Sequence, residues 1–303
     1  MKLFVIFANF ERRTIVEMKK IIIAFAALML VGNGAAAQDS LRVRFLGTGA
    51  ADWKVPEKDG AFRRTTSALL DSRVLIDFNK CNADMLPEGC SPEVAFYTHS
   101  HGDHYNAKSA LEQGLRRVYV SETWVERCRK DFARASEATG LSAPEIIGLK
   151  TGQKIEECGL TLTALPGNHA TSHLDEQCLI YLVEKGSFRL LYATDTGGIM
   201  AVAARLAGID AHVADGKPIT ALIMEATMGA EYDEDFRIYT HSSMDTVLRI
   251  AHVLRKTGRL VGNCPVYLTH LARTLHPSQA ELDKTLPEPL KAAFDGLEVV
   301  LSE

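Results

Sequence analysis

Short apolar segments follow one another along most of the chain, and polar residues, glycine or proline separate them. Residues 41–46 alternate apolar and polar side chains, which predicts a half-buried strand. Residues 50–65 are polar and contain Pro56 and Gly60, which predicts a long loop. Further short strands are expected at 67–70, 74–78, 94–97, 118–121, 155–165, 179–183, 188–193, 221–224 and 266–269.

Segments with helical periodicity separate many of these strands. The segment 242–257 is the clearest, because its apolar residues share one face at i, i+3 and i+4 spacing and Gly258 follows it. Other helices are expected at 105–113, 123–139 and 200–206 and after the strand at 266–269. Two halves of strands with outer helices predict an α/β fold in which two sheets pack face to face, a four-layer αββα sandwich.

The first 37 residues have the pattern of an export signal. Residues 18–20 (Met-Lys-Lys) precede an apolar run at 21–32, and three alanines at 35–37 precede Gln38. A basic start, a short apolar core and small residues at a cleavage point are typical of a secretory signal peptide. The alternative, a membrane anchor, would need a run of roughly 20 apolar residues. We therefore expect residues 1–37 to be removed and the domain 38–303 to be periplasmic or secreted. Residues 1–17 are expected either to precede the true start at Met18 or to extend the basic region of the signal.

Charge and cysteine content restrict the partners. The chain carries a formal net charge of −4, and removal of residues 1–37 leaves 29 basic and 36 acidic residues, a net charge of −7. Such a surface gives no general attraction for nucleic acid or anionic membranes, so neither is expected as a stable partner. Export would permit disulfides among the six cysteines, but none has Cys-x-x-Cys spacing, which favours structural roles for them.

One segment concentrates metal-binding chemistry. Residues 98–104 read Thr-His-Ser-His-Gly-Asp-His and follow the expected strand at 94–97. His99 and His101 alternate on an extended chain, so both imidazoles can point to one side. Gly102 is expected to permit a sharp turn that places Asp103 and His104 at the start of a helix, facing the same point. Three histidines and a carboxylate within six residues suit zinc or a similar divalent ion.

Further candidate ligands follow later strands. His169, Asp195 and His270 each stand directly after an expected strand or within a few residues of its end. Alone, a histidine there is more often hydrogen-bonded within the protein, and Asp195 before Thr-Gly-Gly is more often a turn residue. The segment 99–104 cannot complete two coordination spheres, however, and the three later residues would supply the missing ligands.

These motifs resemble the metallo-β-lactamase superfamily over roughly residues 41–303. The His-x-His-x-Asp-His run carries most of the resemblance, which implies the αββα fold of that superfamily and two divalent metal ions, zinc or manganese. It also implies one ion held by His99, His101 and His169, a second held by Asp103, His104 and His270, and Asp195 as the bridge. Residues 74–77 look like the family's early strand that ends in a supporting Asp, although Asn79 stands where a glycine is usual.

The C-terminal half is similar to the ribonuclease Z branch and to a related cyclic phosphodiesterase of phosphonate breakdown. Residues 224–227 (Met-Glu-Ala-Thr), His241 before two serines and Leu-Thr-His at 268–270 carry this similarity. In that branch the counterpart of His241 contacts the scissile phosphate and helps to protonate the leaving group, and a glutamate such as Glu225 orients it. The residue-level alternative is that His241 only caps the following helix.

The opening of the chain also looks like this branch. Residues 45–50 (Phe-Leu-Gly-Thr-Gly-Ala) and 63–67 (Arg-Arg-Thr-Thr-Ser) carry that likeness. Arg63 and Arg64 are therefore candidates to contact substrate phosphate, whereas exposed arginines are usually only solvated. The branch commonly forms dimers, which leaves a homodimer open.

The combined interpretation is a binuclear metal-dependent hydrolase that cleaves small phosphodiesters, such as cyclic nucleotides or sugar phosphates, by attack of metal-bound hydroxide. Asp103 would orient the hydroxide and His241 would protonate the departing alkoxide. Export, negative charge and the lack of a long basic insertion argue against transfer-RNA processing. Two alternatives stay open: a metallo-hydrolase of lactones, β-lactams or thioesters, and a non-catalytic metal- or ligand-binding protein on the same fold.

Overall fold

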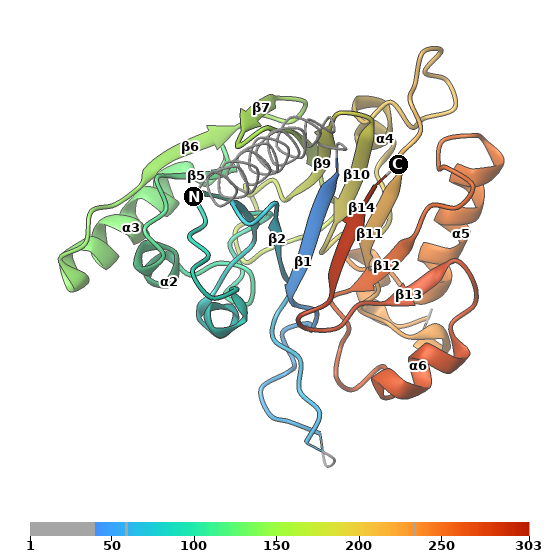
Figure 1. The fold of residues 1–303 in the computed structure, drawn as a ribbon, viewed down its shortest axis with the longest axis horizontal. Coiled ribbons are helices and arrows are strands. Elements are labelled where there is room, and N and C mark those ends of the chain that lie inside the picture. The colour runs from blue at the N-terminus through green and yellow to red at the C-terminus, as the bar shows by residue number, and fades with distance from the viewer. Residues whose placement is uncertain (1–39, 58–59, 233, 303) are drawn as a thin grey trace, which may run out of the picture. The chain divides into compact units, whose positions relative to one another are not determined.

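The computed structural model describes residues 40–57, 60–232 and 234–302, so the expected signal peptide at 1–37 lies outside the described residues. Fourteen strands form two seven-stranded sheets within the unit Leu41–Leu301 (Figure 1). The strands of the first sheet are β1 (Leu41–Gly47), β2 (Ser67–Leu70), β3 (Val74–Ile76), β4 (Val94–Phe96), β5 (Arg117–Ser121), β6 (Glu145–Leu149) and β14 (Glu298–Leu301). Those of the second are β7 (Lys154–Glu157), β8 (Leu160–Pro166), β9 (Leu179–Lys185), β10 (Phe188–Ala193), β11 (Ala221–Glu225), β12 (Val266–Thr269) and β13 (Leu290–Ala292).

The two sheets have the same internal plan. Their strand orders are β14-β1-β2-β3-β4-β5-β6 and β13-β12-β11-β10-β9-β8-β7. In each sheet one half is antiparallel and the other is parallel: β3 to β6 and β10 to β13 run parallel, whereas β14 to β3 and β7 to β10 are antiparallel. The middle of the chain, β7 to β10, thus consists of antiparallel hairpins.

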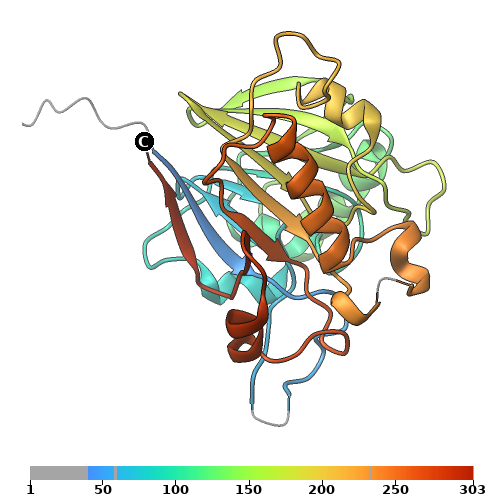
Figure 2. The same cartoon turned by 90° about the vertical axis from the view of Figure 1, so that its right-hand side faces the viewer.

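Helices cover the outer face of each sheet. Figure 2 shows α5 lying across the outer face of the second sheet. The α-helices are α2 (Ala107–Glu112), α3 (Val125–Thr139), α4 (Ala201–Leu206), α5 (Met244–Lys256) and α6 (Gln279–Thr285), and the 3-10 helices are η1 (Lys80–Met85), η2 (Ala230–Tyr232) and η3 (Phe236–Tyr239). Among the described residues, no helix combines the length and the apolar character that a membrane crossing needs.

The alternation of side chains along the strands produces the layers. In β10, Leu190 and Tyr192 point into the core between the two sheets, whereas Leu191 and Ala193 point into the core beneath the helices. Both faces of the strand are thus apolar, as expected for a sheet covered on both sides. The predicted four-layer αββα sandwich is confirmed. All six cysteines are free thiols.

Candidate metal centre

The candidate ligands lie where strands of both sheets end. His99 and His101 follow β4, His169 follows β8, Asp195 follows β10 and His270 follows β12. Side chains that leave neighbouring parallel strands at their carboxyl ends meet at one edge of a sheet. Asp195 and His270 have positive φ angles of 44° and 54°, a region that costs a non-glycine residue about 1–3 kcal/mol. The fold therefore holds these two side chains in place at some cost in stability.

The first group of candidate ligands is His99, His101, His169 and Asp195, whose ligand atoms all lie within 4.8 Å of one another. Nδ1 of His101 is 2.9 Å from Nε2 of His99 and 3.2 Å from Nε2 of His169. Oδ2 of Asp195 is 3.4 Å from Nε2 of His99 and 3.5 Å from Nε2 of His169. Three imidazoles and one carboxylate thus converge on one point.

The second group is Asp103, His104 and His270. Oδ2 of Asp103 is 3.3 Å from Nε2 of His104 and 3.5 Å from Nε2 of His270. Asp195 contacts this group as well, with Oδ2 3.4 Å from Nε2 of His104 and Oδ1 2.9 Å from Nε2 of His270. Asp195 therefore stands between the two groups, which is the position that a bridging carboxylate would need.

The surroundings of the histidines fit a divalent cation. Nδ1 of His104 is 2.8 Å from Oδ2 of Asp77, and Nδ1 of His270 is 2.8 Å from Oγ1 of Thr227. Such outer contacts fix the ring of a metal-binding histidine and leave its other nitrogen free for the metal. Nε2 of His104 and Nε2 of His270 are buried and form no hydrogen bond, although the carboxylate oxygens of Asp103 and Asp195 lie 3.3 Å and 2.9 Å from them. These two nitrogens lack a partner that a metal ion would supply.

The charge balance of the site leads to the same conclusion. Burial lowers the pKa of His99 and His169, which keeps both imidazoles neutral and able to coordinate a metal. Burial also opposes protonation of His270, but the carboxylates of Asp195 and Asp103 outweigh it and raise the pKa of His270 to about 10. The carboxylates of Asp103 and Asp195 thus favour positive charge between them. A divalent cation would supply that charge in place of the protons on the histidines.

His241 lies beside both groups and is held by Glu225. Nδ1 of His241 is 3.1 Å from Oε1 of the fully buried Glu225, which also accepts a hydrogen bond of 2.6 Å from the backbone N–H of Thr196. The ring centroid of His241 is 4.7 Å from that of His169 and 5.6 Å from that of His270. Burial lowers the pKa of His241, but Glu225 outweighs it and raises that pKa above its ordinary value. An imidazolium here can donate a proton.

Two helices begin later in the chain than the sequence predicts. His241 does not open α5, because the helix begins at Met244 and is capped by the side chain of Ser243. Asp103 and His104 lie in a turn, and α2 begins only at Ala107 after its cap Asn106. In both places the capping residue stands a few positions later than the sequence pattern suggested. The helix-cap alternative for His241 is thereby excluded.

Asn79, which stands where the family usually has a glycine, supports the turn that carries Asp103 and His104. Its side-chain N–H group donates to the carbonyl of Asp103 at 2.6 Å and to Oγ1 of Thr65 at 2.7 Å. Gly102, in contrast, has no positive φ angle, and a Cβ added there would meet nothing within 4 Å. The turn is thus held by Asn79 and does not require the glycine.

Glu176 is a supporting residue that the sequence did not reveal. Its buried carboxylate accepts hydrogen bonds from Ser100 N–H at 2.7 Å and from Ser100 Oγ at 2.6 Å. Arg127 on α3 holds the same carboxylate at 2.6 Å. Ser100 stands between His99 and His101, so Glu176 fixes the backbone that presents both imidazoles.

We expect Glu176→Ala to weaken metal binding by about 10–100-fold, because outer residues that orient ligands contribute that much to metal affinity. Competition against a chromophoric chelator measures the effect. Glu137→Ala, an exposed glutamate of α3, is the matched control. Equal affinity in both variants would show that Ser100 needs no such support.

The two candidate phosphate-binding arginines are engaged with protein groups. Arg63 is buried, and its guanidinium donates to Oγ1 of Thr48 at 2.7 Å, to the carbonyl of Ala293 at 2.7 Å and to Oε1 of Gln279. Arg64 forms a two-bond ion pair with the carboxylate of Asp84. The contacts of Arg63 tie the loop before β2 to the C-terminal segment, which is a structural role.

Arg63→Ala is therefore expected to lower the free energy of unfolding by about 3 kcal/mol, since it leaves several buried acceptors without a donor. Thermal and urea unfolding of the variant measure this loss. A variant with unchanged stability and a raised KM would instead favour the role in substrate binding.

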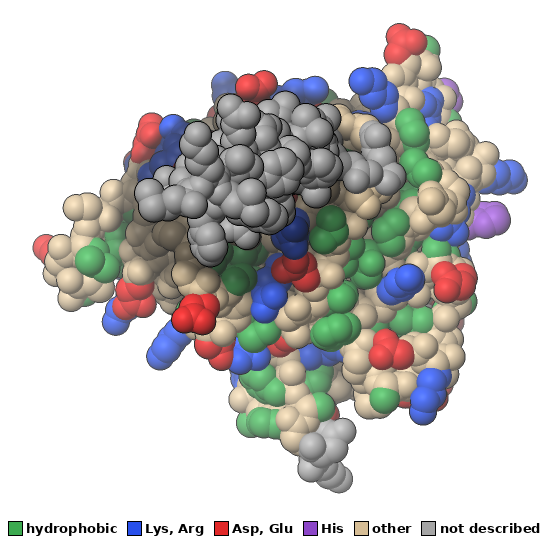
Figure 3. Space-filling view, in the orientation of Figure 1, with side chains coloured by type: hydrophobic (Ala, Val, Ile, Leu, Met, Phe, Trp, Pro, Cys, Tyr) green, Lys and Arg blue, Asp and Glu red, His purple; other side chains and the backbone are tan. Residues whose placement is uncertain are grey.

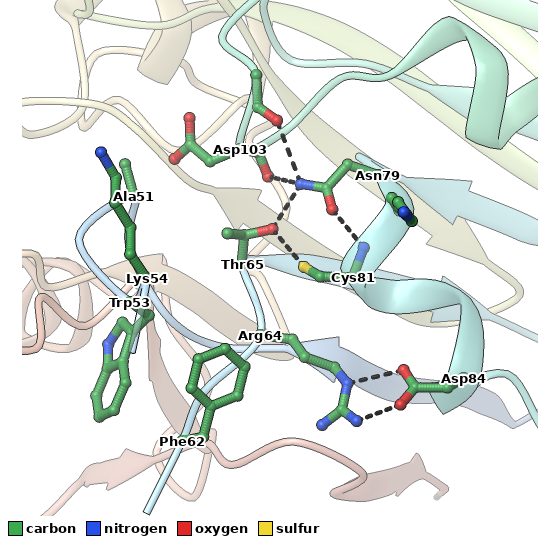
Figure 4. A pocket seen from close by; sticks show the side chains of 12 residues that line it. Ala51, Trp53, Lys54, Phe62, Arg64, Thr65, Asn79, Cys81, Asp84 and Asp103 are labelled. Carbon is green, nitrogen blue, oxygen red and sulfur yellow. Dashed lines mark hydrogen bonds and ion pairs between the residues drawn. The ribbon is translucent and has the colours of Figure 1, made fainter. Parts of the chain in front are cut away.

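A cavity of about 720 Å³ opens beside Asp103 (Figure 4). Trp53, Phe62 and Lys54 from the loop after β1 line it, together with Lys80, Gly102 and Asp103. Asp103 belongs both to this wall and to the second ligand group. The cavity therefore adjoins the candidate metal centre at Asp103.

Comparison with known proteins identifies the family to which this chain is similar. The protein-family model described as "Beta-lactamase superfamily domain" matches residues 84–270 of the sequence, more than half of the chain. No curated protein gave a match. The structure resembles YhfI, a metallo-beta-lactamase fold protein from Bacillus subtilis, with a TM-score of 0.63 and 18% identity over 86% of this chain and 100% of that one.

Two further solved structures resemble this one. A diphosphatase from the PhnP family has a TM-score of 0.61 and 20% identity, with 87% of this chain and 99% of that one covered. The short form of human tRNase Z has a TM-score of 0.59 and 16% identity, with 85% and 98% covered. At these identities the likeness concerns the fold.

The αββα sandwich, the clusters of histidine and aspartate at its strand ends and the matching family model agree with one another. The first two are features of the structure, whereas the third depends on the sequence alone. The chain therefore belongs to the metallo-β-lactamase superfamily.

Proposed function

We propose that this protein is a metal-dependent phosphodiesterase of the ribonuclease Z-like branch that cleaves small phosphodiesters. The observation that carries the proposal is the pair formed by His241 and the buried Glu225, which stands beside both ligand groups. A carbonyl hydrolase would use the same metal ligands but gives this pair no purpose. A diester with an alkyl leaving group, in contrast, needs a proton donor at the departing oxygen.

The proposed ligand sets use all seven candidate residues. His99, His101 and His169 would hold one divalent ion, Asp103, His104 and His270 a second, and Asp195 would bridge them. Zinc suits imidazole and carboxylate ligands, and manganese is the second candidate. Ions held here would lower the pKa of water toward neutrality and offset the charge of the phosphate.

The chain's own residues perform the remaining steps. Asp103 borders the cavity and the second ligand group, so its carboxylate can orient the attacking water. His241 would give its proton to the departing oxygen, and Glu225 keeps Nδ1 of His241 engaged so that Nε2 is left for this task. Burial of the ligand groups keeps bulk water away from these charges, which strengthens each electrostatic contact.

Small substrates suit the surface and the cavity better than a folded RNA. The chain is acidic overall, and Figure 3 shows basic and acidic side chains intermixed on the face that it draws. A long nucleic acid would need a basic stripe to hold its phosphates. We therefore propose a small-molecule phosphodiester as the substrate and no stable nucleic-acid partner. A homodimer and a periplasmic or secreted location after removal of residues 1–37 complete the proposal.

Hydrolysis of bis(p-nitrophenyl) phosphate tests the proposal. Protein that begins at Gln38 would be loaded in turn with zinc and manganese and assayed in parallel on p-nitrophenyl phosphate diesters, lactones and a β-lactam. We expect turnover of the diester, loss of that turnover with a chelator and recovery on adding the metal. Turnover of only the carbonyl substrates would favour the metallo-hydrolase alternative. Metal binding without any turnover would favour a binding protein.

A further inference from the structure

The cavity beside Asp103 has an aromatic wall. Trp53 and Phe62 come from the loop after β1 and contact each other edge to face, with ring centroids 6.2 Å apart and planes at 88°. Phe62 remains 41% exposed although it is large and apolar. Figure 4 shows both rings on one side of the cavity, in the lower part of the view, and Asp103 on the opposite side. An exposed aromatic pair beside a candidate reaction centre offers a planar ligand group a surface to stack on.

Trp53 is fixed relative to the candidate metal centre. Its indole N–H donates a 2.7 Å hydrogen bond to the carbonyl of Leu271, the residue directly after His270. The ring also packs closely over Gly49, where an added Cβ would lie 2.6 Å from a Trp53 ring atom. The aromatic wall thus has a defined position with respect to the ligand groups, as a recognition surface requires.

The charges around the cavity suit an anionic ligand. Lys54 and Lys80 line it, and neither has an ion-pair partner among the residues that the structure describes. Arg64 is neutralised by Asp84. A volume of about 720 Å³ lies within the range of small-molecule sites, roughly 300–1,000 Å³. The cavity thus combines a planar apolar wall, a net charge of +1 from three basic side chains (Lys54, Arg64, Lys80) and two acidic ones (Asp84, Asp103), and room for a molecule of nucleotide size.

From these features we infer that the cavity binds the base of a nucleoside phosphodiester. The base contacts Trp53 and Phe62, and the phosphate lies at the end of the cavity formed by Asp103. Sugar phosphates without an aromatic ring lose this contact and are poorer substrates. The inference rests on the proposed phosphodiesterase function, and the cavity adds the substrate class.

A pair of substrates with the same reacting ring tests the inference. Adenosine 2′,3′-cyclic phosphate and glycerol 1,2-cyclic phosphate both contain a five-membered cyclic phosphate, but only the first carries a nucleoside. We expect the ratio of their kcat/KM values to fall about tenfold or more in Trp53→Leu, because stacking of one base on an aromatic side chain contributes that much. Trp53→Phe should keep most of the ratio. Phe236→Leu changes an aromatic residue that is 73% exposed and does not line the cavity, and it should leave the ratio unchanged.

A binding measurement separates this inference from the proposed function. The chain has two tryptophans, and Trp124 is only 2% exposed, so quenching of tryptophan fluorescence by adenosine monophosphate reports on Trp53. Saturable quenching that Trp53→Phe removes would support the inference even if no diester is cleaved. Cleavage of diesters without quenching, and with an unchanged substrate ratio in Trp53→Leu, would overturn the inference and leave the proposed function standing.

Discussion

His241→Ala is expected to lower kcat for phosphodiesters with alkyl leaving groups by about 10²–10⁴-fold, the usual contribution of a positioned general acid. An alkoxide is a strong base and departs slowly unless it is protonated, whereas p-nitrophenolate departs without a proton. His241 is placed for this step because Glu225 holds its Nδ1 at 3.1 Å and raises its pKa. The measurement is kcat for a series of diesters whose leaving groups differ in pKa.

The variant should lose much less activity toward bis(p-nitrophenyl) phosphate, so the dependence of rate on leaving-group pKa becomes steeper. His212→Ala, which removes an exposed histidine paired with Asp210, is the matched control. Glu225→Gln should change the slope in the same direction, since the amide no longer favours the imidazolium. Equal losses across the series would contradict the role of His241 as the acid and leave it a role in binding.

Asp195→Asn should reduce metal content below two ions per chain and lower phosphodiester turnover on the order of 10³-fold. Asp195 places a carboxylate oxygen against each group, Oδ1 toward His270 and Oδ2 toward His99 and His104. A bound metal pair contributes several kcal/mol of charge stabilisation, and each 1.4 kcal/mol corresponds to about tenfold in rate. Elemental analysis of the purified variant, with activity on the same sample, measures both effects.

Asn is nearly isosteric with Asp, so the variant keeps the packing around the strand end. Asp215→Asn removes one exposed carboxylate and serves as the control for charge alone. If Asp195→Asn retained two ions and full turnover, Asp195 would not be a bridge, and the two ligand groups would act independently.

Much of the fold could be predicted because the periodicity of the strands and helices is local. The alternation in β1 and the apolar stripe of α5 are visible in the sequence and confirmed by burial. The strands β6, β13 and β14 were not predicted, since short segments such as Glu298–Leu301 have little periodicity of their own. The single strand expected at 155–165 is the antiparallel hairpin of β7 and β8. β14 becomes a strand because it pairs with β1, from the opposite end of the unit.

The candidate site likewise contains residues that the sequence predicts and residues that only the folded structure reveals. The seven candidate ligands could be named because each stands at a strand end and carries metal-binding chemistry, and the structure brings all seven together. Glu176 could not be found, because its contact with Ser100 spans 76 positions and no local pattern marks it. Arg63 looked like a surface cation, whereas its acceptors on Thr48, Gln279 and Ala293 become neighbours only after folding.

The central claim is that the two ligand groups hold a pair of metal ions that the protein uses to cleave phosphodiesters. Titration of metal-free protein with zinc or manganese, with hydrolysis of bis(p-nitrophenyl) phosphate followed at each addition, tests it most directly. We expect hydrolysis to rise until two ions are bound per chain and then to level off. Full occupancy of both groups without diester hydrolysis, or hydrolysis by the metal-free protein, would contradict the claim.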